Sequence, residues 1–421
     1  MKKGTINFLK ESIRAKKMFR FLLCFSLGLY VFSIPSFSGR ELLNYFYYAV
    51  FTFFVICIVF YKILYSSFKF DLRHYILVIF SFNALIGTIL YSHAFREWAT
   101  VFLMSVAFFV AVMVFDEINN KRLILYITYF ALFCFAAFFV FKYRSELFKI
   151  SQISSLRLGD YFDNVNAVST YFTLGLGLSL FLVLFSKKRI EFLNLIPSLV
   201  FVFLGITTGS RSFVITSSLL VLLLIILRFR KRKILLAIVL VSFAGLVFLL
   251  INLPFMNTIK NRMLDMIRTV FTGTEAEGST IQRSIMQQYG FYFGVKNMLF
   301  GLGAHGFATF SGVGTYSHSN LSEVFCDFGI VGLACFYSVW YICFLNSSKV
   351  KDNYKLFAIS FLVVEIVHSF FAVLFSSKIS AFELALCIFL CCPENPSYIP
   401  TWLRFSNNNN KYGEMFFEIR I

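Results

Sequence analysis

Long apolar runs follow one another along almost the whole sequence, and they decide what this chain can fold into. From Met18 nearly to the C-terminus, run after run reaches about 17 to 25 residues. As a helix, each run can cross the ~30 Å hydrocarbon core of a bilayer while pairing its own backbone polar groups. The chain is 59% hydrophobic and 14% charged, with a mean hydropathy of +0.77. These values predict an all-α, polytopic integral membrane protein.

About twelve membrane-spanning helices are expected. The predicted spans are residues 18–35, 42–61, 74–92, 97–115, 123–141, 168–186, 192–208, 212–229, 234–252, 328–346, 355–373 and 377–392. The first span lacks a small-residue cleavage site and further spans follow it, so it is interpreted as an uncleaved anchor. The predicted organisation is five helices over 1–141, an exterior loop over 142–167, four helices over 168–252, a large exterior loop over 253–327, three helices over 328–392 and a tail over 393–421.

Basic residues predict the orientation, because Lys and Arg in short loops are retained on the cytoplasmic side. Clusters such as "KKR" at 187–189 and "RFRKRK" at 228–233 place both termini in the cytoplasm. The net charge of +18 is therefore interpreted as a topology signal, and the lipid bilayer rather than nucleic acid is the expected partner. The nine cysteines, mostly within predicted spans, indicate neither a disulfide framework nor a zinc site, and no cofactor is expected.

The large exterior loop is the main exception to the short connections. Its length of about 75 residues is typical of functional loops. The stretch "MNTIKNRMLDMIRTV" places apolar residues on one helical face, and "STIQRSIMQQYGFYFGVKNMLFGLGAHGF" predicts a second amphipathic helix. A turn punctuated by Gly301, Gly303 and Gly306 follows that helix.

Polar candidates gather on the predicted exterior side. In "TTGSRS", Arg211 follows a Gly-Ser turn that suits a phosphate, although an arginine anchoring a helix end at the interface fits equally well. His318 lies in a Gly/Ser/Tyr-rich turn with no evident structural task and could serve as general base for a hydroxyl. His305 is a second, lower-ranked candidate. Asn320 and Glu323 have capping-box spacing, so they are expected to start the tenth span.

Three motifs in a fixed order give the sequence a family likeness. These are "TGSRS" at 208–212, "GLGAHGF" at 301–307 and "SHSNLSEVFCDFGIVGL" at 317–333. With about twelve spans and one long exterior loop, they resemble the O-antigen polymerase and O-antigen ligase family. The segment "RLGDYFDNVNAVS" at 157–169 is similar to an earlier exterior element of that family, with Val165 in place of the proline of an Asn-Pro-Asn triplet. The resemblance spans roughly residues 157–336.

The resemblance implies a metal-independent glycosyltransferase at the outer face of the bacterial inner membrane. Its substrate would be an oligosaccharide linked to undecaprenyl diphosphate, and a chain-length regulator protein is a candidate partner. Arg211 and Arg283, with Arg157 as a weaker third cation, would bind the diphosphate, since guanidinium groups bind phosphate oxygens in bidentate fashion. His318 would activate the acceptor hydroxyl. The residues that could orient the imidazole or contact the acceptor are Asn320, Glu323, His305 and Asp327.

Three functions stay open at this point. A polymerase for O-antigen or capsular polysaccharide is favoured over a ligase because the "SHSNLSEVF..FGIVGL" form looks closer to it. A flippase for lipid-linked oligosaccharides would need ionisable residues or broken helices near mid-membrane in both halves. The chain has few such residues, and Glu365 with His368, three positions apart, are expected to pair within the bundle. A structural scaffold would leave the long patterned loop unexplained.

Overall fold

The computed structural model describes residues 3–36, 41–66, 72–91, 95–147, 158–162, 164–186, 189–252, 256–272 and 278–392. Every regular element in these ranges is helical, which confirms the all-α prediction. The elements are α1 (Lys3–Ser36), α2 (Glu41–Tyr65), α3 (Leu72–Leu90), α4 (Phe95–Ile118), α5 (Lys121–Lys142), α6 (Arg144–Leu147), α7 (Val165–Phe185), the 3-10 helix η2 (Arg189–Asn194), α8 (Leu195–Thr207), α9 (Arg211–Phe229), α10 (Lys233–Ile251), α11 (Asn257–Thr272), α12 (Gly278–Lys296), α13 (Gly306–Phe310), α14 (Asn320–Ser347), α15 (Tyr354–His368) and α16 (Lys378–Cys391).

Within the described ranges, nine helices are long and apolar enough to cross a membrane: α1 to α5, α7, α8 together with η2, α9 and α14. The chain is thus a multi-pass membrane protein. The predicted count of twelve is not confirmed, because α10 is a shorter apolar helix and α15 and α16 have only 15 and 14 residues. α15 ends at His368, before the predicted limit of its span at residue 373, and α14 begins at Asn320, before the predicted start at 328.

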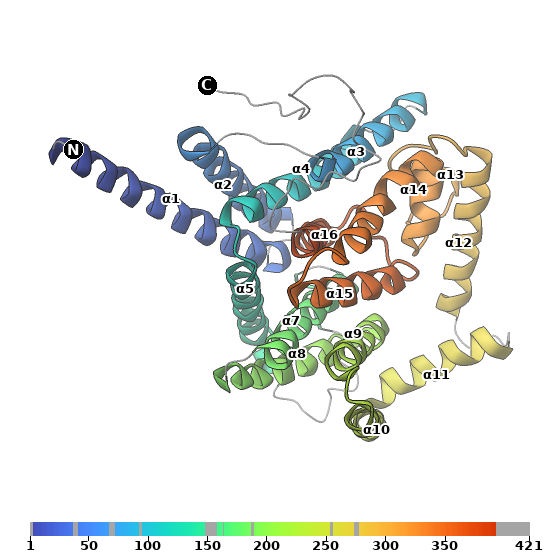
Figure 1. Cartoon of the computed structure of the whole chain (residues 1–421). Coiled ribbons are helices and arrows are strands. Elements are labelled where there is room, and N and C mark those ends of the chain that lie inside the picture. Colours follow the sequence, from blue (N-terminus) through green and yellow to red (C-terminus); the bar gives the residue numbers. More distant parts are fainter. Residues whose placement is uncertain are drawn as a thin grey trace.

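Aromatic side chains join helices that are far apart in the sequence. Tyr30 of α1 stacks on Phe54 of α2, with ring centroids 4.7 Å apart, and also meets Phe382 of α16 at 6.4 Å. Phe115 of α4 packs on the same Phe382 at 5.8 Å. Such ring pairs add to the apolar area that the helices bury against one another. The N-terminal helices therefore close around α16, which lies near the middle of the molecule in Figure 1.

Ion pairs between different parts of the chain gather at one end of the bundle. They join the ends of α2 and α4, the starts of α3 and α5, the loop before α15 and the η2 turn before α8. The pairs are Lys62 with Glu117, Arg73 with Asp116 at 3.2 Å, Lys121 with Asp352 at 2.7 Å and Arg122 with Glu191 at 2.6 Å. Because successive helices alternate in direction, all these positions belong to the end that the basic residues assign to the cytoplasm.

The two amphipathic helices predicted for the long loop are present as α11 and α12. In Figure 1 they form an arm at the side of the bundle, and α12 packs along α14. The contact is close because Gly294 of α12 lies against the ring of Phe325, where any added Cβ would approach to 2.4 Å. The long loop is therefore folded back onto the first turns of α14.

A break divides α14 at Gly329, which adopts φ 64° and ψ −164°. Residues 298–303 cross the helix there and pair with its interrupted backbone. Ile330 N–H donates to the carbonyl of Met298 at 2.7 Å, and Gly303 N–H donates to the carbonyl of Asp327 at 2.7 Å. Non-helical backbone is tolerated at membrane depth only where protein or water satisfies it, which these bonds do. The glycine-punctuated turn is thus pinned to the broken helix.

Candidate functional site

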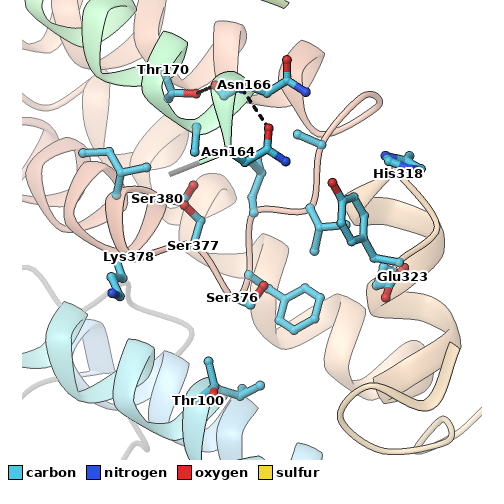
Figure 2. Close-up of a pocket in the computed structure, with 18 of the residues that line it drawn as sticks. Thr100, Asn164, Asn166, Thr170, His318, Glu323, Ser376, Ser377, Lys378 and Ser380 are labelled. Carbon is cyan, nitrogen blue, oxygen red and sulfur yellow. Dashed lines mark hydrogen bonds between the residues drawn. The ribbon is translucent and has the colours of Figure 1, made fainter. Parts of the chain in front are cut away.

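A cavity of about 600 Å³ lies at the end of the bundle opposite the ion pairs. Its walls come from the starts of α2, α4, α7, α14 and α16, from the segment after α15, and from the loop before α14. Figure 2 shows His318 and Glu323 on one side of this cavity and, on another, Ser380 of α16 with Ser377, the N-cap of that helix. By the alternation of the helices, this is the end predicted to face the exterior.

His318 lies at the cavity in a strained, tightly bonded turn. Its backbone has φ 61°, in the left-handed region that non-glycine residues rarely occupy. Ser317 N–H donates to the Glu323 carboxylate at 2.5 Å, and the Ser317 hydroxyl donates to the Ser319 carbonyl at 3.1 Å. The imidazole packs on the Tyr316 ring, with centroids 4.4 Å apart. The turn therefore places the imidazole at the cavity wall.

The electrostatics of His318 favour its neutral form. Burial lowers the pKa of His318 to about 4, and the positive charge of Arg283 on α12 lowers it as well. A neutral imidazole has one ring nitrogen free to accept a proton. The effect of Arg283 also shows that this guanidinium lies within electrostatic range of His318, although Arg283 itself does not line the cavity.

The predicted capping box is wrong. Ser319, not Asn320, is the N-cap of α14, and Ser319 makes no side-chain capping bond. The Asn320 carboxamide oxygen instead accepts from Leu374 N–H at 2.8 Å and from Phe375 N–H at 3.0 Å, and its NH₂ donates to a tyrosine hydroxyl. Asn320 is fully buried, so it joins α14 to the segment between α15 and α16 and shapes the cavity wall.

Two further candidates meet at the cavity through backbone contacts. Asp327 is fully buried, and its carboxylate accepts from His305 N–H at 3.1 Å and from Phe307 N–H at 2.7 Å. His305 is the N-cap of α13 with φ 64°, and its exposed side chain lines the cavity. Asp327 therefore fixes the backbone of His305 and does not hydrogen-bond either imidazole ring.

The arginines lie apart from the cavity lining. Arg211 begins α9 directly after Ser210, whose hydroxyl caps the helix and donates to the cavity residue Asn166 at 2.9 Å. Neither Arg211 nor Arg283 is among the lining residues, and Arg157 lies outside the described residues. The structure thus brings His318, Glu323 and His305 to one cavity, and the Ser210 to Asn166 bond connects the start of α9, where Arg211 lies, to the cavity lining.

A comparison with known families matches the part of the chain that carries His318. Residues 196–337 match the family model described as O-antigen ligase. Over these residues the chain is similar to that family. The match confirms the resemblance seen in the sequence, and it contains Arg211, Arg283, His305 and His318. At family level it supports glycosyl transfer by a membrane enzyme of the ligase or polymerase type. No curated protein matches the sequence.

Sequence reasoning missed Asn44 and Lys378, two cavity residues outside the matched range 196–337. Lys378, the first residue of α16, donates from Nζ to the Asn44 carboxamide oxygen at 2.9 Å and lies 4.0 Å above the Tyr47 ring. The tripeptide "SSK" at 376–378 is a polar stretch between two apolar runs, and it was the sequence feature that could have pointed to Lys378. His368 also lines the cavity, and its Nδ1 lies 3.8 Å from the Glu365 carboxylate, as expected for a pair within the bundle. No group of three or more metal-ligating side chains occurs in the described ranges.

Proposed function

We propose that this protein is a polysaccharide polymerase of the outer face of the bacterial inner membrane. It transfers an undecaprenyl-diphosphate-linked glycan, of the O-antigen or capsular type, onto a hydroxyl of another lipid-linked repeat unit. The observation that carries the proposal is the position of His318. This neutral imidazole lies within the residues that match the O-antigen ligase model, in a cavity at one end of the membrane bundle and within electrostatic range of Arg283.

The chemistry assigned to the cavity is a direct displacement. The acceptor hydroxyl oxygen attacks the anomeric carbon of the donor sugar, and the bond from that carbon to the diphosphate oxygen breaks. His318 takes the hydroxyl proton, and the diphosphate leaves with the electron pair. A single displacement inverts the configuration at the anomeric carbon. Glu323 contributes by holding the turn that carries His318, through its bond to Ser317.

Arg211 and Arg283 are assigned to the leaving diphosphate. A guanidinium binds two phosphate oxygens at once and keeps its charge, so it stabilises the departing anion without a proton transfer. A bound diphosphate would also offset the positive charge of Arg283 that lowers the pKa of His318. His318 is therefore expected to be a stronger base with the donor in place than in the free protein.

The second candidate is an O-antigen ligase, because the family model that matches residues 196–337 is described by that activity. The two activities differ only in the acceptor. The deciding experiment incubates the purified protein with lipid-linked repeat units alone, and a ladder of longer glycans supports the polymerase. Inertness until lipid A core is added would replace the polymerase by the ligase.

A flippase is less well supported by the helices. The break of α14 at Gly329 is a broken-helix feature, but it lies in the C-terminal half and is satisfied by residues 298–303. Cells lacking the protein separate the classes: a single repeat unit on lipid A core indicates a missing polymerase. No glycan on the core at all would instead indicate a ligase or a flippase.

A further inference from the structure

Part of the cavity lining lies outside the residues that match the O-antigen ligase model and has the chemistry of a sugar-binding surface. This surface, here called the glycan wall, consists of cavity residues at the starts of α2, α4 and α7: Asn44, Tyr48, Glu97, Thr100, Asn164 and Asn166. In Figure 2, Thr100 lies well away from His318, and Asn164 lies between His318 and Ser380. The family match begins at residue 196, so none of the glycan wall belongs to it.

The hydrogen-bonding groups of the glycan wall suit hydroxyl groups. The Asn44 carboxamide oxygen accepts from Lys378 at 2.9 Å, and the Asn166 carboxamide oxygen accepts from the Ser210 hydroxyl at 2.9 Å. Each amide is thereby held in place, and neither NH₂ group makes a hydrogen bond in the described part of the chain. Glu97 adds a carboxylate that no hydrogen bond or ion pair engages there. Amide donors beside a carboxylate acceptor match sugar hydroxyls, which both accept and donate.

The same groups suit a phosphate less well. The carboxylate of Glu97 repels an anion, and the Lys378 ammonium at this part of the cavity is engaged by the Asn44 carboxamide oxygen and the Tyr47 ring. Arg211 and Arg283, the cations assigned to the diphosphate, do not line the cavity. The Tyr48 ring supplies an apolar surface for the carbon face of a sugar ring. A cavity of about 600 Å³ is also within the range that holds compact ligands.

We propose that the glycan wall binds the sugar residues of the acceptor and selects which glycan is extended. The inference rests on the proposed function, since it places the acceptor opposite the base of that reaction. Donor diphosphate and acceptor sugars would then occupy different parts of the site. Specificity would come from helices α2, α4 and α7, and the chemistry from the residues that match the O-antigen ligase model.

The variant Glu97→Gln tests this, because it keeps the size of the side chain and removes its charge. The control is Glu146→Gln, the same change on α6 at a carboxylate that accepts from Ser145 and does not line the cavity. The probe is a soluble repeat-unit oligosaccharide with a nitrophenyl aglycone and no lipid or diphosphate. Its binding to the full-length protein in nanodiscs is measured by saturation-transfer NMR, and its KM as acceptor is measured with saturating lipid-linked donor.

Glu97→Gln is expected to weaken oligosaccharide binding and raise the acceptor KM by about tenfold or more, the loss typical of one hydrogen bond to a charged group. The donor KM and the Glu146→Gln control should match wild type. Unchanged binding in Glu97→Gln, or a rise in donor KM alone, would overturn the acceptor assignment even if transfer proceeds. Wild-type protein that binds the oligosaccharide through Glu97 without transferring any glycan would overturn the proposed function and leave the sugar site standing.

Discussion

The pH dependence of glycan transfer tests the assignment of His318 as base. Burial and Arg283 lower the pKa of His318 to about 4, so the imidazole of the free protein is neutral from about pH 5 upward. We expect kcat/KM, which reports the free enzyme, to be flat between about pH 5 and 8 and to fall with protonation near about pH 4. The midpoint for kcat should lie higher, because bound diphosphate offsets Arg283.

The variant Arg283→Gln gives this expectation a magnitude. The pKa of His318 falls from its ordinary value of 6.5 to about 4, and burial is the larger of the two causes. Removing the Arg283 charge can therefore restore less than half of the fall, which keeps the midpoint of kcat/KM below about 5.3. Arg283→Lys keeps the charge, so its midpoint should stay near about 4 while donor KM rises for lack of the guanidinium fork.

The assay is release of undecaprenyl diphosphate from a labelled donor by protein in nanodiscs, followed across about pH 3.5 to 8. His318→Ala should remove the acid limb together with most of the turnover. An identical acid limb in Arg283→Gln and wild type would refute the electrostatic link between α12 and His318. Full activity in His318→Ala would move the base elsewhere, with His305 next in line.

Three substitutions test the framework around the site. Gly329→Ala should lower the melting temperature by several degrees and reduce transfer, because an added Cβ would lie 2.3 Å from the Leu299 carbonyl oxygen and φ 64° costs about 1–3 kcal/mol for alanine. Gly245→Ala is the control, because no atom from outside its own helical turn lies within 4 Å of the new Cβ. This variant should keep the wild-type melting temperature and rate of transfer. Asn320→Ala removes the oxygen that accepts from the Leu374 and Phe375 N–H groups. Each unpaired N–H costs about 1–3 kcal/mol, so the melting temperature should fall further than for a surface alanine variant. Arg211→Ala should abolish transfer with the protein still inserted, and Lys should rescue poorly; normal product from Arg211→Ala would refute its phosphate role.

Hydropathy predicted the helices because each depends on its own sequence. The break in α14 could not be predicted in that way. Gly329 lies in "CDFGIVGL", which resembles an ordinary apolar helix, and the break is satisfied by residues 298–303 through tertiary hydrogen bonds. The end of α15 at His368 was missed for a similar reason. The apolar composition continues beyond this residue, while the chain turns away to meet the Asn320 carboxamide.

The site was predictable where its residues are close in sequence. His318 and Glu323 lie five positions apart, and one turn brings both to the cavity. Asn320 was misassigned because its spacing to Glu323 fits a capping box, whereas its real partner Leu374 lies 54 positions away. The bond between Lys378 and Asn44 joins residues 334 positions apart, and no local pattern marks such a pair. Asn164 and Asn166 of the glycan wall lie in the segment 157–169 that carries part of the family likeness, but only the folded bundle brings them to one cavity with Asn44 and Glu97.

Sidedness decides whether the cavity can meet an exported lipid-linked glycan. Two matched variants test it in a background without native cysteines: Ser376→Cys, at the cavity, and Ser348→Cys, an exposed position at the end that carries the ion pairs. Because α14, α15 and α16 alternate in direction, these positions lie at opposite ends of the bundle. A membrane-impermeant maleimide added to intact spheroplasts should label Ser376→Cys at once, and Ser348→Cys only after permeabilisation. The reverse pattern would place His318 in the cytoplasm and refute transfer at the outer face, while leaving the fold and the cavity unchanged.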